Sequence, residues 1–320
     1  MTTLLEVKNL NAGLGEGDYR SLLDQINFTV KKGEAIAVVG ESGCGKSMTA
    51  LSIMGLLPRN IKIKSGEIKL EGVELTSKSQ KEMNEIRGKE IAMIFQEPLT
   101  SLNPSFTIGN QIAEVLKYHT DYTAEQIKEK SIEVLKQVNM PDPEEKLKAY
   151  PHELSGGMRQ RVMIAMALAC HPKILIADEP TTALDVTIQA QILELITELQ
   201  NKFNMSIIMI THDLGVVAET CQRAIVMYAG QIVEESSVEE LFEKPLHPYT
   251  RGLMLSAPRL GNPKEKLHVI EGTVPDPDDM PKGCRFSPRC EFATEKCFAE
   301  EPPLEQVDKS RRVRCWHKLL

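Results

Sequence analysis

The segment AIAVVGESGCGKS, residues 35–47, decides which fold this chain can adopt. It places an apolar, strand-like run directly before a glycine-rich loop that ends in Lys46 and Ser47. The stretch that follows, TALSIMGLL, is compatible with a helix, and strand, loop and helix in this order form the setting of a phosphate-binding loop. The glycines let the backbone turn so that successive N–H groups point inward, and the start of the helix adds partial positive charge.

Two side chains of this loop supply the rest of the phosphate chemistry. Lys46 brings a full charge to the β- and γ-phosphates, and the Ser47 hydroxyl can ligate Mg²⁺, which prefers hard oxygen ligands. Cys44 is either a thiol activated by the helix start or, the favoured interpretation, a tolerated small residue; its redox sensitivity stays open. The residues expected to contact the nucleotide here are Gly40, Ser42, Gly43, Cys44, Gly45, Lys46, Ser47 and Met48.

Polar side chains follow three further apolar runs. Asp178 ends ILIAD, at the edge of a parallel strand that faces the ligand crevice, and can bind Mg²⁺ there. Glu179 comes next and is placed to polarise the attacking water as a general base. His212 follows SIIMIT and can reach the γ-phosphate from the strand end. Gln96 follows IAMIF; alone it would pass for a surface residue, but its amide could ligate Mg²⁺ weakly.

The motif LSGGM, residues 154–158, lies between the phosphate loop and the acidic pair. Ser155 comes 109 residues after Lys46, near the C-terminal end of a helical insert at about 97–165. The three motifs in this order suggest a nucleotide-hydrolysing engine that works as a pair of subunits.

Composition excludes several classes of protein. The chain has 320 residues with a net charge of -7, so a broad basic footprint for nucleic acid is not expected. No uncharged apolar run reaches the ~18 residues that a transmembrane helix needs, and the N-terminus lacks the pattern of a signal peptide. We therefore expect a cytoplasmic protein whose contact with a membrane comes through a partner.

The chain divides near residue 240. Residues 1–239 show apolar, strand-like runs at 35–39, 174–178, 206–211 and 224–228, with longer helical patterns at 124–139 and 188–200. The alternating segments around Ile26 and Ile68 indicate an antiparallel sheet with one wet face. Ten of the 18 prolines lie from Pro245 onward, which predicts a small, loop-rich domain over 240–320 that needs a staple.

Four cysteines crowd this last segment, at Cys284, Cys290, Cys297 and Cys315. A reducing compartment disfavours disulfides, so the cluster indicates a metal site. The spacing C-x5-C-x6-C-x17-C matches neither the tight knuckle of structural zinc sites nor the bacterial ferredoxin run, and it leaves zinc and an iron–sulfur cluster both open.

Taken together, these motifs resemble the ATP-binding subunits of ATP-binding-cassette (ABC) transporters over about residues 4–235. The resemblance implies an α/β P-loop ATPase with a mixed-sheet core, an antiparallel β subdomain and a helical subdomain. It implies ATP and Mg²⁺ as cofactors, with Ser47, Gln96 and Asp178 on the metal, Glu179 as base and Lys46 and His212 on phosphate. It also points to the segment Ala183-Leu184-Asp185 beside the nucleotide and to an aromatic residue, here Tyr19, stacked on adenine.

In this family the signature motif faces the ATP held by the other subunit. Ser155, Gly156 and Gly157 would present N–H groups and a helix start to that γ-phosphate. The resemblance therefore implies that ATP joins two subunits and that hydrolysis releases them.

A narrower resemblance is carried by FQEPLTSLNP (95–104), HPYTRGLMLSAP (247–258) and the terminal cysteines, which look like the ATPase subunits of dipeptide/oligopeptide importers. It implies a [4Fe–4S] cluster on the four cysteines, with zinc as the lesser alternative. It also implies as partners a second ATPase, two permease subunits and an extracytoplasmic binding protein, at the cytoplasmic face of the membrane. A nickel or other small-solute importer of the same subgroup remains an alternative, and a soluble non-transport ABC ATPase is a remote one. The transported substrate, the role of the cluster and the isolated oligomeric state stay open.

Overall fold

The structure is a computed structural model that describes residues 2–15, 19–96, 101–182, 184–256 and 269–319. The chain forms two compact units. The first unit comprises residues 1–2, 31–34 and 77–208, and the second comprises residues 3–30, 35–76 and 209–320.

The strands of the first unit are buried on both faces. β6 (Ile91–Ile94) and β7 (Ile174–Asp178) run parallel, with Ile91 opposite Ile174. β8 (Ser206–Thr211) is the next strand beside β7, and its last three residues belong to the second unit. Every residue of β7 and β8 is buried, as expected for strands covered on both sides. The apolar runs at 174–178 and 206–211 are thereby confirmed as strands.

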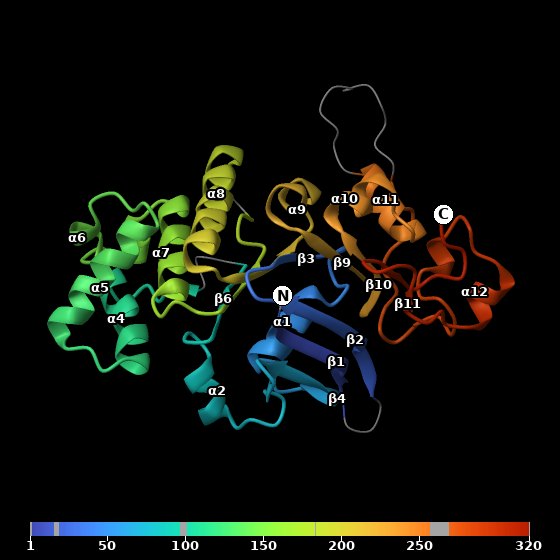
Figure 1. Ribbon diagram of the computed structural model, residues 1–320, viewed down its shortest axis with the longest axis horizontal. Coiled ribbons are helices and arrows are strands. Elements are labelled where there is room, and N and C mark those ends of the chain that lie inside the picture. The colour runs from blue at the N-terminus through green and yellow to red at the C-terminus, as the bar shows by residue number, and fades with distance from the viewer. Residues whose placement is uncertain (1, 16–18, 97–100, 183, 257–268, 320) are drawn as a thin grey trace. The chain divides into compact units, whose positions relative to one another are not determined.

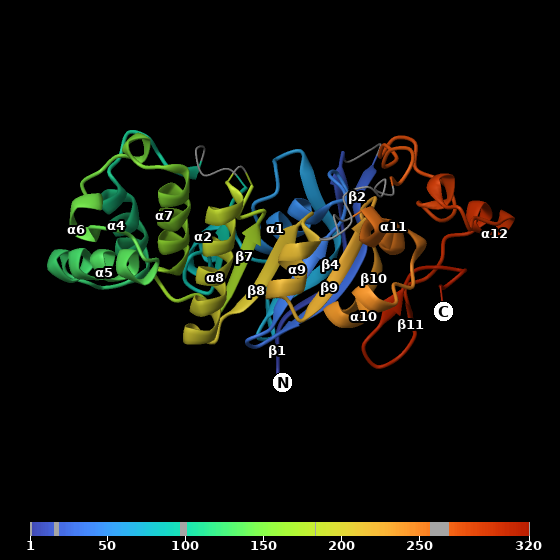
Figure 2. The same ribbon diagram turned by 90° about the horizontal axis from the view of Figure 1, so that it is seen from above.

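The helices among the described residues of the first unit are α2 (Gln80–Ile86), α4 (Ile108–His119), α5 (Ala124–Gln137), α6 (Pro143–Lys146), the 3₁₀ turn η1 (Pro151–Glu153), α7 (Gly156–Leu168) and α8 (Val186–Phe203). α5 begins at a capping box on Thr123 and buries Ile127, Val134 and Leu135 on one face. This face packs on α4 and α7, and α5 runs crosswise to α7 in Figure 2.

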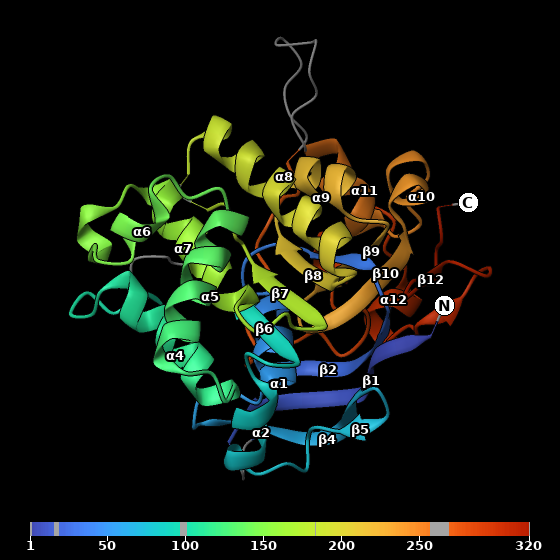
Figure 3. The ribbon, with the colours of Figure 1, turned by 60° about the vertical axis from the view of Figure 1, so that its left-hand side comes forward.

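The second unit contains an antiparallel sheet with the order β2-β1-β4-β5. Its strands are β1 (Thr3–Leu14), β2 (Arg20–Lys31), β4 (Ile61–Leu70) and β5 (Val73–Glu74). β1 and β4 pair from Leu5 opposite Leu70 to Leu14 opposite Ile61, and they lie side by side in Figure 3. Alternate residues of β2, among them Ile26 and Phe28, are buried, which confirms the expected antiparallel sheet with one wet face.

A second group of strands in this unit has the order β11-β12-β10-β9-β3. β3 (Ala35–Val39) pairs in parallel with β9 (Arg223–Tyr228), and β10 (Gln231–Ser237) returns antiparallel to β9. The helices of the unit are α1 (Lys46–Met54), α9 (Leu214–Thr220), α10 (Val238–Glu243), α11 (Pro248–Ser256), the 3₁₀ turn η2 (Ser287–Arg289) and α12 (Glu295–Ala299). In Figure 1 α10 and α11 lie beside β10.

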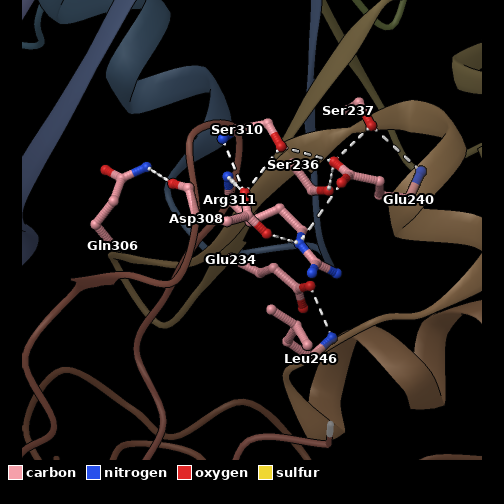
Figure 4. A network of polar contacts seen from close by, with 9 residues as sticks. All are labelled: Glu234, Ser236, Ser237, Glu240, Leu246, Gln306, Asp308, Ser310 and Arg311. Atoms are coloured by element: carbon pink, nitrogen blue, oxygen red, sulfur yellow. Dashed lines mark hydrogen bonds and ion pairs between the residues drawn. The ribbon is translucent and has the colours of Figure 1, made fainter.

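The C-terminal residues add two short strands to this group. β12 (Arg312–Val313) pairs with β10 and β11 (Glu305–Gln306) pairs with β12. The fully buried carboxylate of Glu234 in β10 accepts the backbone N–H groups of Leu246 and His247, both at 2.8 Å, just before α11 begins. Figure 4 shows Glu234 with Leu246, and nearby Ser310, whose hydroxyl donates to Glu240 at 3.0 Å. The start of α11 and strand β12 are therefore attached to β10 by hydrogen bonds, of which those to Glu234 are buried. The metal staple that the sequence suggested for residues 240–320 stays a prediction.

Candidate functional site

The phosphate loop lies between a buried strand and the start of a helix. β3 ends at Val39 and α1 begins at Lys46, so residues 40–45 form the turn between them. Gly45 has φ +103°, and a Cβ atom there would lie 2.8 Å from Cδ2 of Leu23. Both the backbone conformation and the space around it therefore require glycine at this position.

The ammonium group of Lys46 folds back over this loop. Its Nζ donates to the carbonyl oxygens of Gly40 at 2.7 Å and Glu41 at 3.0 Å. The start of α1 has Gly45 as its N-cap, without a side-chain cap and without an acidic residue in the first turn. Its N–H groups and dipole are therefore suited to an anion, and Ser47 lies in this first turn.

Cys44 is fully buried inside the loop. Burial raises the pKa of its thiol, although Lys46 acts in the opposite direction. A thiol held neutral in this way is a poor nucleophile, which favours the interpretation of Cys44 as a tolerated small residue.

In the first unit, Glu179 directly follows the buried carboxylate of Asp178 at the end of β7. Its backbone has φ +46°, a conformation that is strained for a residue with a side chain. Oε2 of Glu179 accepts hydrogen bonds from Nε2 of Gln96 and from Oγ1 of Thr182, both at 2.9 Å. The structure thus brings Gln96 and Glu179 together. Sequence reasoning missed Thr182, whose only signal is its place three residues after Glu179.

The signature segment forms the beginning of α7. Ser155 is the N-cap residue, and its hydroxyl accepts the N–H of Met158 at 3.3 Å. Leu154 is buried, whereas Ser155 is exposed. Gly157 packs against α8, where an added Cβ would lie 2.8 Å from Cγ2 of Ile188. An exposed serine at a helix start is accessible to a ligand from another molecule.

Asp185 is the N-cap of α8 and accepts the N–H of Ile188 at 3.0 Å. The next residue, Val186, is 84% exposed, which is unusual for an apolar side chain. Ala183, which the sequence analysis placed beside the nucleotide, lies outside the described residues. So do residues 97–100 of the segment FQEPLTSLNP and the last two residues of HPYTRGLMLSAP.

The remaining predicted residues of the nucleotide site, His212 and Tyr19, belong to the second unit. His212 is exposed directly after β8. The Lys64 ammonium lies 4.1 Å from the centre of the Tyr19 ring, so a cation already covers one part of this aromatic group. Stacking of Tyr19 on adenine stays a prediction, as do the positions of Ser42, Gly43 and Met48 against a nucleotide.

The four C-terminal cysteines line one small cavity together with aromatic side chains, among them Phe286, Phe292 and Trp316. None of the four forms a disulfide. The N–H of His317 donates to Sγ of Cys315 at 3.3 Å. Within the described ranges, no three His, Cys, Asp or Glu side chains are grouped so that they could hold a metal ion. The thiols therefore share a cavity without the spacing of a single-ion site.

Burial raises the pKa of three of these thiols, those of Cys284, Cys290 and Cys315. The pKa of Cys290 is raised to about 11 and that of Cys315 to about 12, mainly by burial and to a smaller extent by the neighbouring cysteines. Without a metal, the thiols of Cys290 and Cys315 are therefore neutral at physiological pH.

Across the residues described, no helix is both long enough and apolar enough to cross a membrane.

Comparisons with known proteins connect this geometry to a family. A family model described as "ABC transporter" matches residues 23–182, and one described as "Oligopeptide/dipeptide transporter, C-terminal region" matches residues 233–297. The chain is 54% identical to the oligopeptide transport ATP-binding protein AppD of Bacillus subtilis, over 99% of this chain and 97% of that protein. It is 50% identical to the dipeptide transport ATP-binding protein DppD of Haemophilus influenzae, over 98% and 94%.

Among solved structures, the fold is similar to the ATP-binding cassette MJ0796, described as a dimer in a post-hydrolysis state bound to ADP and Pi. The TM-score is 0.66 at 28% identity, covering 73% of this chain and 99% of that chain.

Proposed function

The chain belongs to the ATP-binding proteins of the ABC transporter family, and from this premise we propose that it hydrolyses ATP to energise import of dipeptides or oligopeptides. The peptide assignment rests on one observation: the chain is similar over nearly its whole length to ATP-binding proteins of peptide transport. This similarity includes the C-terminal region. Di- and oligopeptides are thus the favoured substrate class. A nickel or other small-solute importer of the same subgroup is the alternative.

The roles of the nucleotide-site residues follow from their chemistry. The phosphate loop and Lys46 bind the β- and γ-phosphates, and His212 contacts the γ-phosphate. Ser47, Asp178 and Gln96 offer the hard oxygen ligands that Mg²⁺ prefers. Glu179 accepts the proton of the attacking water as general base, and the hydrogen bonds from Gln96 and Thr182 to its Oε2 support this role by orienting the carboxylate.

A second ATPase subunit completes the site. Ser155, Gly156 and Gly157 contact the γ-phosphate of the ATP that the partner subunit holds, and Asp185 lies beside that contact. The exposure of Ser155 at the start of α7 supports this arrangement. So does the dimeric state described for the similar cassette MJ0796. The assembled importer contains two permease subunits and an extracytoplasmic binding protein, and this chain acts at the cytoplasmic face of the membrane.

The cysteine cavity is a candidate site for a [4Fe–4S] cluster on Cys284, Cys290, Cys297 and Cys315. Four thiolates are the usual ligand set of such a cluster, and an N–H···S bond like that of His317 is typical of its surroundings. A single zinc ion needs four sulfurs at about 2.3 Å from one point, which the spacing of these thiols does not favour. The test is a visible absorption spectrum of anaerobically purified protein, together with analysis of its iron, sulfide and zinc content. These measurements distinguish a bound iron–sulfur cluster, a bound zinc ion and a site without metal.

Peptide import is tested with the complete transporter in proteoliposomes, loaded inside with MgATP. We expect uptake of a labelled di- or oligopeptide when the binding protein is present outside, and none with the Lys46→Ala variant. Uptake of Ni²⁺ instead of peptide would support the alternative substrate class and refute the peptide assignment.

A further inference from the structure

Glu41 follows Gly40 in the phosphate loop. Two residues of the C-terminal segment, Tyr249 and Arg289, form hydrogen bonds with it. Its backbone N–H donates to the Tyr249 hydroxyl at 2.8 Å. Its carboxylate forms a two-pronged ion pair with Arg289, at 2.7 Å to Nη1 and 3.0 Å to Nη2. Its carbonyl oxygen accepts from Lys46. Side chain and main chain of one loop residue are therefore both fixed.

Arg289 is itself held rigidly. Its side chain is only 4% exposed. Nε donates to the carbonyl oxygen of Glu271 at 2.8 Å, and Nη2 donates to that of Ile270 at 3.2 Å. The guanidinium also lies 5.7 Å from the ring centre of Tyr228. Because its donors are directed in a fixed fork, Arg289 holds the Glu41 carboxylate in one orientation.

Tyr249 is equally constrained. It is fully buried, and its ring centre lies 4.7 Å from that of Tyr228 and 5.4 Å from that of Phe286. Burial raises the pKa of its phenol, so the hydroxyl stays neutral beside the loop. The oxygen that accepts the N–H of Glu41 therefore has little freedom to move.

The charge of Glu41 explains why such control matters. A carboxylate in a loop that receives a triphosphate repels the ligand unless a cation neutralises it. Arg289 provides that cation and directs the carboxylate toward itself. Tyr249 fixes the peptide group that joins Gly40 to Glu41, at the first turn of the loop.

We propose that Arg289 and Tyr249 are positioning residues for nucleotide binding, which neutralise Glu41 and hold the phosphate loop in the shape that accepts the triphosphate. The C-terminal region thereby becomes part of the nucleotide site. This inference rests on ATP binding at residues 40–47 and is independent of the solute that is transported.

The test measures the Kd for MgATP and the steady-state kinetics of the full-length protein. For Arg289→Gln we expect Kd and KM to rise about tenfold, because small displacements of a binding loop are costly, with kcat at saturating ATP little changed. Arg289→Lys keeps the charge without the fork and should give an intermediate Kd. Tyr249→Phe, which keeps the ring, should also weaken binding, and it serves as the second probe if Arg289→Gln does not fold.

Arg312→Gln is the matched control. Arg312 is also a C-terminal arginine, and it forms an ion pair with Glu235 in β10 and donates to the Asn27 carbonyl oxygen at 2.7 Å, neither of which belongs to the phosphate loop. This variant should lower the melting temperature without changing the Kd for MgATP. If Arg289→Gln and Arg312→Gln weaken ATP binding equally, general loosening of the C-terminal region explains the effect and the proposal is wrong.

A double-mutant cycle shows whether Arg289 acts through Glu41. With Glu41→Gln as background there is no carboxylate to neutralise, so adding Arg289→Gln should change Kd much less than in the wild type. Additive effects would overturn the proposal, as would an unchanged Kd in Arg289→Gln and Tyr249→Phe. A wild-type protein that does not bind MgATP would instead contradict the ATPase assignment itself.

Discussion

Glu179 illustrates how one side chain is prepared for its role. It occupies a strained backbone conformation at the end of β7, and one of its carboxylate oxygens receives two hydrogen bonds, from Gln96 and Thr182. Strain of this kind persists only where the surrounding structure fixes the residue, and it is frequent at active sites.

Replacing Glu179 by Gln should slow ATP hydrolysis without weakening ATP binding. The amide keeps the shape of the side chain but cannot take the proton, so we expect kcat to fall about 10²- to 10⁴-fold. Phosphate release measures kcat, and equilibrium binding of MgATP measures Kd. Thr182→Val, which removes one hydrogen bond to the carboxylate, is the control and should have a smaller effect. Full activity of Glu179→Gln would exclude Glu179 as the base.

His247 predicts how stability depends on pH. It is buried, and burial lowers its pKa to about 3, against 6.5 for the free side chain. Between these values the unfolded chain binds a proton that the folded chain does not. The free energy of unfolding should therefore fall as pH falls below 6.5, by at most about 1.4 kcal/mol per pH unit.

The variant His247→Asn tests this dependence. His247 Nδ1 accepts the N–H of Tyr249 at 3.0 Å, and the asparagine oxygen can replace it as acceptor. Urea unfolding at pH 7 and pH 5 should show a smaller loss of stability in His247→Asn than in the wild type. His152, which is exposed, provides the control variant His152→Asn with the wild-type slope. Identical slopes in all three proteins would contradict the assignment to His247.

At the scale of elements, sequence patterns predicted what depends on neighbours along the chain. The run at 35–39 became β3 with the same bounds, and the helical pattern at 124–139 became α5, which ends two residues earlier. Burial on both faces produces continuous apolar runs, and burial on one helical face produces a 3.6-residue period, so both leave a visible trace. Gln96 and Glu179 were each singled out because each follows a strand, and the hydrogen bond between them was not foreseen.

Contacts between polar side chains far apart in sequence leave no such trace. The ion pair between Arg289 and Glu41 joins residues 248 positions apart. Glu234 accepts a hydrogen bond from the backbone N–H of Leu246, a group that almost every residue type carries and that therefore leaves no mark on the sequence. Sequence reasoning therefore missed how firmly the C-terminal residues attach to the phosphate loop and to β10. It assigned that task to the cysteines alone.

The packing of α7 on α8 distinguishes the two glycines of the signature motif. A Cβ at Gly157 would lie 2.8 Å from Ile188, whereas one at Gly156 would lie 3.6 Å from Leu184, an ordinary contact. Gly157→Ala should therefore lower the free energy of unfolding by about 1–3 kcal/mol, as overpacking does. Gly156→Ala, the matched control, should be neutral or slightly stabilising because alanine favours helices. Urea denaturation measures both, and equal stability of the two variants would contradict this packing argument.

At the scale of the whole molecule, the proposed nucleotide site requires a second subunit. The phosphate loop has a lysine and a helix start without a side-chain cap, whereas the signature motif presents an exposed serine at another helix start. In the proposed dimer, two half-sites of this kind would let ATP binding close the subunits and hydrolysis open them. The membrane subunits would use that movement for transport.

The most direct test is an experimental structure of the assembled transporter that contains the Glu179→Gln chain and MgATP. We predict that the Ser155 hydroxyl of this chain lies at hydrogen-bond distance, about 2.7–3.0 Å, from the γ-phosphate of the ATP held by the partner ATPase. The ATP bound by Lys46 of this chain should meet the partner's signature motif in the same way. If Ser155 lies far from every bound phosphate, the shared nucleotide site does not exist and the account is wrong.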